Sequence, residues 1–167
     1  MERITNLKDL FIEQLRDLYN GEKQQLNSLH ELRDKTLESE LRQAVDKYVD
    51  ETKEHISRLE NIFNNLNITS SGEKCESMEG LMNEAIKLTE KCVDSEVMDA
   101  GIITSLQRIN HYEMAGYGTV CTFAKELGHN EISETLHKTL EEAKNMDFHL
   151  SKLAKEQVNE RAKVSTI

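Results

Sequence analysis

Residues 102–124 read IITSLQRINHYEMAGYGTVCTFA, and the apolar side chains of this stretch recur at steps of three and four residues. Steps of this size place side chains on one face of an α-helix. Glu113 falls on the same face as its apolar neighbours. The stretch therefore predicts a buried helix with one carboxylate on its buried face, and the stripe consists of Ile102, Leu106, Ile109, Glu113, Tyr117, Val120 and Ala124.

The same periodicity outlines four long helices, which we expect over residues 6–34, 37–66, 95–127 and 130–160. The chain of 167 residues contains no proline and only seven glycines, so little in it interrupts a helix. Thr5 or Asn6 is expected to cap the first helix. Gly128 is expected to end the third helix, and Asn130 to cap the fourth. We expect a single all-α domain over residues 1–167.

The links between these helices predict how they are arranged. The first and last links, at residues 34–36 and 128–129, are short, so each joins two antiparallel neighbours. The middle link is nearly 30 residues long and carries a short helical pattern at about residues 78–90. A link of this length can run back along the bundle. The sequence therefore predicts a ferritin-like antiparallel four-helix bundle with a long crossover that contains a short extra helix.

Each of the other three apolar stripes is also interrupted by an acid. These acids are Glu22, Glu51 and Glu142, and His55 follows Glu51 at a helical spacing of four residues. The spacing from Glu22 to Glu51 is 29 residues, as is the spacing from Glu113 to Glu142, so the four carboxylates should meet at one height. Buried carboxylates that face one another drive each other toward protonation, and a bound dication removes this conflict. The pattern predicts a centre that holds two iron or manganese ions, as in di-metal carboxylate bundles.

The fourth helix offers the least certain ligands. Glu142 is followed at the next helical positions by Asn145 and Met146, and a thioether is a poor ligand for a hard metal. Asp147 is the nearest acid, and it could reach the centre through a π-bulge or by holding the metals from the opposite side. The predicted metal ligands are Glu22, Glu51, His55, Glu113, Glu142 and Asp147. Nearby tyrosines are expected to orient the carboxylates, and these are Tyr19, Tyr48, Tyr112 and Tyr117.

Charge and hydropathy exclude several other classes of protein. The chain has 31 acidic and 21 basic residues and a formal charge of −10, which disfavours binding to nucleic acid or to an anionic membrane. It has no apolar run long enough to span a bilayer and no apolar signal sequence at its start, so we expect a cytoplasmic protein. Its three cysteines form no Cys-x-x-Cys pair and are expected to be reduced thiols.

Several stretches of this chain resemble the YciE/YciF family of bacterial ferritin-like stress proteins. The resemblance covers about 160 residues, and it implies a rubrerythrin-like fold, a di-iron or di-manganese centre and a homodimer. Relatives often carry a further acid where this chain has Ala143, which puts a ligand at that position in doubt. The stretches that carry the resemblance are YNGEKQ at 19–24, ETKEHI at 51–56, MEGL at 78–81, HYEMAGYG at 111–118, and LEEAK at 140–144 with Asp147.

Three functions are compatible with these features. The first is a metal-binding stress protein whose reduced di-iron form reacts with oxygen or peroxide. Such a reaction needs electrons, and the chain has no four-cysteine iron centre, so any electron donor would be a separate partner. The second is a non-catalytic helical interaction protein in which water, histidine and tyrosine satisfy a metal-free polar layer. The third, an iron-storage cage, is least favoured because the family resemblance implies a smaller oligomer.

Overall fold

The computed structural model describes residues 3–164, and this part of the chain is helical without any β-strand. A π-helical turn at Ala154–Val158 joins the last two helices. The helices are α1 (Leu7–Lys35), α2 (Ser39–Leu66), α3 (Glu76–Lys91), α4 (Ser95–Glu126), α5 (Asn130–Leu153) and α6 (Asn159–Val164). The expected all-α fold is confirmed. The expected domain boundaries at 1 and 167 lie outside the described residues.

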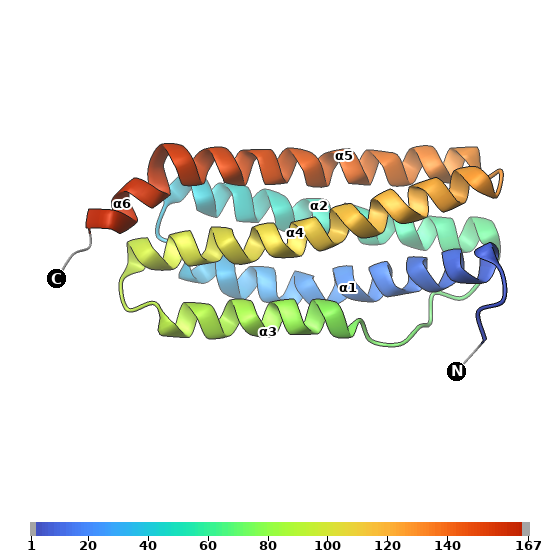
Figure 1. The fold of residues 1–167 in the computed structure, drawn as a ribbon, viewed down its shortest axis with the longest axis horizontal. Coiled ribbons are helices and arrows are strands. Elements are labelled where there is room, and N and C mark those ends of the chain that lie inside the picture. Colours follow the sequence, from blue (N-terminus) through green and yellow to red (C-terminus); the bar gives the residue numbers. More distant parts are fainter. Residues whose placement is uncertain (1–2, 165–167) are drawn as a thin grey trace.

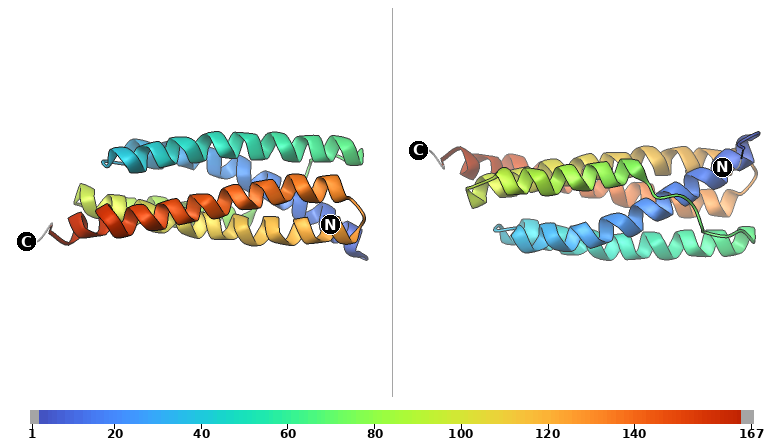
Figure 2. Two further views of the ribbon diagram at one scale, coloured as in Figure 1. Left: turned by 90° about the horizontal axis from the view of Figure 1, so that it is seen from above. Right: turned by 90° about the horizontal axis from the view of Figure 1, so that it is seen from below.

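Four long helices lie side by side, and α3 covers part of their outer surface (Figure 1). Contacts join α1 to α2, α2 to α5, α5 to α4 and α4 to α1, so the four helices surround a common interior. Short turns join α1 to α2 and α4 to α5, and the two helices of each pair are antiparallel (Figure 1). Helix α3 packs against α1 and α4, and Figure 2 shows it along the outside of the molecule. The extended link at 67–75 and α3 together return the chain to the start of α4.

The helix ends follow local side-chain chemistry. Asn6 caps α1, because its side chain accepts a hydrogen bond from the backbone N–H of Asp9 at 2.9 Å. Gly128 follows α4 with φ +79°, a left-handed conformation that glycine adopts without strain. The expected cap at Asn130 is wrong: Asn130 is the first helical residue, and His129 precedes it without a side-chain capping bond. The turn is closed by backbone hydrogen bonds from Gly128 and His129 to the end of α4.

A glycine allows α1 and α4 to approach closely. A Cβ atom built on Gly116 would lie 2.6 Å from Cδ2 of Leu18, closer than two carbon atoms can pack. Leu18 is 3% exposed, so its side chain has little room to move away. A larger residue at position 116 would therefore have to displace Leu18 or separate the two helices that carry Glu22 and Glu113.

The apolar core is divided into two main clusters along the bundle axis. One cluster includes Phe11, Leu15 and Tyr117. The other includes Leu29, Leu41 and Leu106. On each long helix, a short polar segment separates the residues of one cluster from those of the other. The buried polar residues of this layer are Glu22, Gln25, Thr52, His55, Asn110, Glu113 and Thr139.

Two further expectations concern the surface and the cysteines. Within residues 3–164, no helix is both long enough and apolar enough to cross a membrane. Cys75, Cys92 and Cys121 are free thiols, as predicted. Cys75 belongs to a small third cluster that packs α3 onto α4 through Met78, Met82 and Ile109.

Candidate metal centre

Three predicted ligands from three different helices converge in the polar layer. Glu22 of α1, His55 of α2 and Glu113 of α4 each offer one ligand atom, and these atoms all lie within 4.8 Å of one another. Each of the three residues is 1% exposed. Two carboxylates and an imidazole form a donor set that suits iron or manganese, so the residues present fit one such ion.

Two tyrosine hydroxyls hold the carboxylates in place. Tyr117 donates a hydrogen bond of 2.6 Å to Oε1 of Glu22, and Tyr48 donates to Oε2 of Glu113. Both tyrosines are at most 1% exposed. Hydrogen bonds of this kind fix the orientation of a ligand and leave its remaining lone pairs directed at the centre. The expected role of Tyr48 and Tyr117 is therefore supported by their contacts.

Gln25 joins the two buried carboxylates from one side. Its Nε2 donates to Oε2 of Glu22 at 2.8 Å and also to Oε1 of Glu113, and it lies 3.2 Å from the hydroxyl of Thr52. The other amide atom of Gln25, Oε1, has no hydrogen-bond partner among the described residues. Both polar atoms of Asn110 are also buried without a partner among the residues at 3–164. Buried polar atoms without partners are rare and costly, about 1–3 kcal/mol each, and here they lie beside the candidate ligands.

The electrostatics of the centre favour a bound cation. Burial and the neighbouring charge of Glu22 raise the pKa of Glu113 well above its usual range, against the opposing effect of His55 and two hydrogen bonds. Burial acts to lower the pKa of His55, but the hydrogen bond and charge of Glu22, with the charges of Glu113 and Glu142, raise it to about 9. The metal-free centre thus retains protons, because it holds more negative charge than its own side chains neutralise.

Glu142 of α5 contacts this group only through His55. Its Oε2 lies 3.1 Å from Nε2 of His55, while Nδ1 of His55 lies 3.1 Å from Oε1 of Glu22. Arg58 holds both oxygens of Glu142, with Nη2 at 3.0 Å from Oε1 and Nη1 on Oε2. Burial acts to raise the pKa of Glu142, but Arg58, and then His55, lower it. Glu142 is therefore an ionised carboxylate with a cationic partner of its own.

The other two predicted ligands lie outside the buried group. Glu51 is partly exposed and forms an ion pair of 3.2 Å with Lys47. Oδ1 of Asp147 accepts one hydrogen bond from Nε2 of Gln107 at 3.1 Å. The same oxygen lies 3.0 Å from Nε2 of His111. The structure does not bring either residue to Glu22, His55 and Glu113, and their role as ligands stays a prediction.

Helix α5 is regular between Glu142 and Asp147, so of the two possibilities for Asp147 the π-bulge is not found. The π-helical turn lies farther along, at Ala154–Val158. Ala143 is buried next to Glu142 and offers no ligand. Helix α5 consequently contributes one carboxylate at the height of the centre.

Sequence reasoning missed Gln25, Arg58 and Asn110. Each lies three residues from a predicted ligand, namely Glu22, His55 and Glu113, and so on the same helix face. This spacing is the sequence feature that could have identified them as neighbours of the ligands. Conversely, the hydroxyls of Tyr19 and Tyr112 bond to Glu60 and Asp17, away from the centre.

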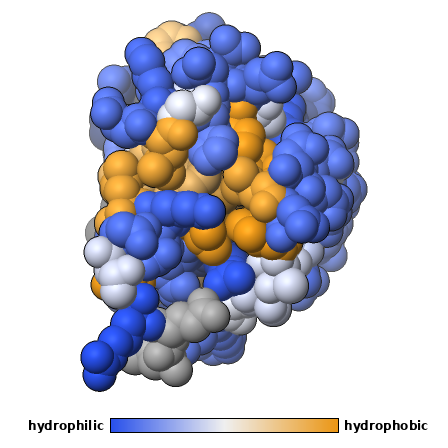
Figure 3. Space-filling model, turned by 90° about the vertical axis from the view of Figure 1, so that its right-hand side faces the viewer, coloured by the Kyte–Doolittle hydropathy of each residue, from blue (hydrophilic) through white to orange (hydrophobic). Residues whose placement is uncertain are grey.

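A surface cavity borders Arg58, the partner of Glu142. It has a volume of about 780 Å³ and is lined by residues of α2 and α5 that include Arg58, Asn61 and Thr135. The cavity also reaches the turn between α4 and α5, at the end of the molecule seen in Figure 3. Apolar side chains gather in the middle of that end and polar ones surround them (Figure 3). Arg58 thus lies between this cavity and the contact of Glu142 with His55.

Fold and site together define a class of helical proteins whose core is interrupted by a buried Glu–His–Glu group. The chain belongs to the YciE/YciF family: the profile of the family described as "Domain of unknown function (DUF892)" matches residues 6–163. It is 38% identical over 157 residues to Protein YciF of Escherichia coli (strain K12), covering 93% of this chain and 95% of that protein.

Two solved structures extend this similarity to the fold. The crystal structure of the E. coli stress protein YciF matches with a TM-score of 0.89 at 37% identity, covering 93% of this chain and 99% of its own. The structure of YcfI from Rhodopseudomonas palustris matches with a TM-score of 0.87 at 33% identity, covering 90% of this chain and 96% of its own.

Proposed function

We propose that this protein is a ferritin-like four-helix-bundle stress protein that binds iron or manganese at Glu22, His55 and Glu113. The observation that carries the proposal is the convergence of three ligand atoms within 4.8 Å of one another, on three fully buried side chains. The E. coli relative is described as a stress protein, which supports the same role here. The raised pKa values of His55 and Glu113 reflect negative charge that the side chains do not neutralise, and a dication would neutralise that charge while releasing the retained protons.

A bound iron or manganese ion would supply redox chemistry with oxygen or peroxide at a coordination position left open by the protein. The chain itself fixes the two carboxylates through Tyr117 and Tyr48. The apolar clusters on either side exclude water from the centre. A surface cavity reaches Arg58, whose partner Glu142 contacts His55. Electrons for repeated turnover would come from a separate partner.

We also propose that the protein acts in the cytoplasm as a homodimer, as its family resemblance implies. The strongly acidic charge of −10 disfavours nucleic acid and anionic membranes as partners. The second ion predicted from the sequence would need a ligand from α5, and the carboxylate at that height, Glu142, is already paired with Arg58.

One observation favours a second candidate function. Every oxygen of Glu22 and Glu113 has a donor or a histidine nitrogen beside it: Gln25 bonds to both carboxylates, and tyrosines bond to each. A polar layer satisfied in this way could specify helix pairing without any metal, in a non-catalytic interaction protein. The unpartnered Oε1 of Gln25 counts against this alternative, because a self-sufficient layer would satisfy it.

Metal analysis of protein purified without chelator tests the proposal. We expect at least one iron or manganese ion per chain, or its uptake when Mn²⁺ is added under anaerobic conditions. Glu113→Ala should abolish the binding, whereas the exposed control Glu134→Ala should not. Wild-type protein that binds neither metal at millimolar concentration would reject the proposal in favour of the metal-free layer.

A further inference from the structure

His55 presents its two ring nitrogens to two different carboxylates. Nδ1 lies 3.1 Å from Oε1 of Glu22, on the side of the candidate ligand group. Nε2 lies 3.1 Å from Oε2 of Glu142, on the side of Arg58. A neutral imidazole that binds metal through one nitrogen carries its proton on the other. A metal-ligating histidine commonly donates that proton to a carboxylate, which fixes the orientation of the ring. Glu142 lies where such an acceptor would be, within hydrogen-bond distance of Nε2.

Arg58 already supplies the positive charge that Glu142 requires. Its guanidinium contacts both carboxylate oxygens, the bidentate geometry that gives arginine pairs their strength and specificity. Nη1 also donates to the hydroxyl of Thr139 at 3.0 Å, which holds the guanidinium between α2 and α5. The side chains of Arg58 and Glu142 are 17% and 23% exposed, so neither partner is fully solvated. Both oxygens of Glu142 therefore already have a cationic partner.

Within residues 3–164, the two other acids predicted as ligands have partners of their own. Glu51 is paired with Lys47, and Asp147 is bonded to Gln107 and lies against His111. The inward carboxylates of the layer are Glu22, Glu113 and Glu142. One divalent ion together with the guanidinium of Arg58 balances their three negative charges, whereas two divalent ions would leave a net positive charge in a buried layer.

We infer that the centre takes one divalent cation, held by Glu22, Nδ1 of His55 and Glu113, and that Glu142 and Arg58 are positioning residues for His55. This inference rests on the proposed function and specifies it further. Glu142 accepts the Nε2–H of His55, and Arg58 keeps Glu142 in place. The pair of Arg58 and Glu142 thus leaves the Nε2 side of His55 with a carboxylate that already has a cationic partner.

The number of ions bound by the wild-type chain gives the first test. Metal-free protein is titrated with Co²⁺ under anaerobic conditions, and the visible absorption of the bound ion is followed to saturation. Mn²⁺ is counted separately by elemental analysis after removal of free metal. We expect one ion per chain with either metal. Two ions per chain would overturn the inference and leave the proposed function standing, whereas none would overturn both.

Variants of Glu142 separate a positioning residue from a ligand. Glu142→Ala should keep one Co²⁺ per chain but weaken its binding by about 10- to 100-fold, the usual effect of losing an acceptor behind a ligating histidine. Glu142→Gln should restore most of this loss and leave the Co²⁺ absorption spectrum unchanged, because its Oε1 still accepts the Nε2–H of His55. The neighbouring exposed acid provides the matched control Glu141→Ala, which should bind as the wild type does. Loss of an ion or an altered spectrum in Glu142→Gln would make Glu142 a ligand and overturn the inference.

Discussion

The hydroxyl of Tyr117 on α4 lies 2.6 Å from Oε1 of Glu22 on α1, in the layer where the apolar core is interrupted. This contact bridges two helices and gives a buried carboxylate a donor in the absence of metal. It also links the stability of the fold to the state of the centre.

Removal of that hydroxyl should destabilise the metal-free protein. Tyr117→Phe leaves a buried carboxylate with one donor fewer, and we expect a loss of about 1.5–3 kcal/mol in the free energy of unfolding by urea. Tyr19→Phe is the matched control, because its hydroxyl bonds to the exposed Glu60, and it should cost less than about 1 kcal/mol. Equal losses in the two variants would contradict the special role of Tyr117.

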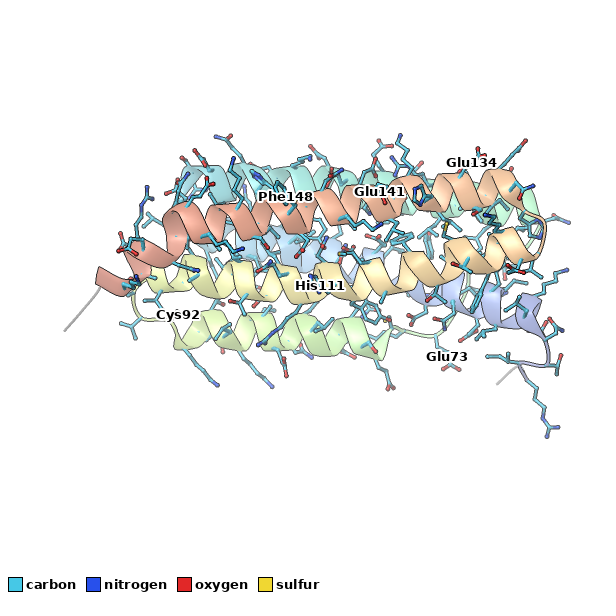
Figure 4. The ribbon with its side chains drawn as sticks, turned by 45° about the horizontal axis from the view of Figure 1, so that its top comes forward. Glu73, Cys92, His111, Glu134, Glu141 and Phe148 are labelled. Atoms are coloured by element: carbon cyan, nitrogen blue, oxygen red, sulfur yellow. The ribbon has the colours of Figure 1, made fainter. Side chains whose placement is uncertain are left out.

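Metal should stabilise the fold. A ligand that binds only the folded state adds about 2.7 kcal/mol at a hundredfold excess over Kd. For a chain of this size, we expect Mn²⁺, or anaerobic Fe²⁺, to raise the Tm by about 5–10 °C, measured by calorimetry. Glu134→Ala, on the outer surface of α5 (Figure 4), should show the same rise. An unchanged melting curve at saturating metal would favour the metal-free polar layer.

Substitution of the acids should divide them into two groups. Glu22→Ala and Glu113→Ala should each abolish metal binding, because neither helix offers another carboxylate at that height. Asp147→Ala should retain the metal content and the peroxide-driven oxidation rate of the ferrous protein, since Asp147 is bonded to Gln107 and lies against His111 instead. A loss of metal in Asp147→Ala would show that Asp147 is a ligand after all.

Control variants for this experiment should avoid Glu38. Its side chain accepts from the backbone N–H of Glu40 at 3.3 Å and also pairs with Arg161, so Glu38→Ala would remove a helix cap. Glu134→Ala is suitable, because Glu134 is exposed.

The stability of the metal-free protein should fall as the pH rises above neutrality. The pKa of His55 is raised from 6.5 to about 9 in the folded state, so the folded protein holds a proton that the unfolded chain has lost in this range. The contribution of this proton to the free energy of unfolding is complete below pH 6.5 and is lost as the pH rises through 9. The free energy should fall by up to about 1.4 kcal/mol per pH unit over this range. Glu113, whose pKa is also raised, acts in the same direction.

Urea unfolding at pH 6, 7.5 and 9 measures this slope. His55→Gln should flatten it, whereas the exposed His137→Gln should not. Saturating Mn²⁺ should reverse the trend, because metal ligation requires a neutral imidazole. A flat profile for the metal-free wild type would show that His55 carries no extra proton in the fold.

The protein should sediment as a dimer. This expectation comes from the family resemblance, and the apolar stripes of the four long helices are already buried within one chain. Analytical ultracentrifugation should give about twice the chain mass of 19.2 kDa. A particle near 24 subunits would instead revive the iron-storage cage.

Much of this fold is determined by local sequence. The first three predicted long helices agree with α1, α2 and α4 to within about two residues, because apolar periodicity is a local property of each segment. The last predicted helix, 130–160, is interrupted after Leu153 by the π-helical turn. No local pattern marks that change, so the sequence did not predict it.

The sequence by itself determined which buried positions of α1, α2 and α4 carry Glu22, His55 and Glu113, because a side chain in the middle of an apolar stripe must face the interior. Only the tertiary structure decided the remaining contacts. A residue at the edge of a stripe can turn inward or outward with a small rotation of its helix, and that rotation depends on all the neighbouring helices. Helix α2 is rotated so that Thr52 and His55 are buried and Glu51 is left with Lys47. The pairing of Arg58 with Glu142 depends on the distance between α2 and α5, a relationship between residues 84 positions apart that periodicity within one helix does not encode.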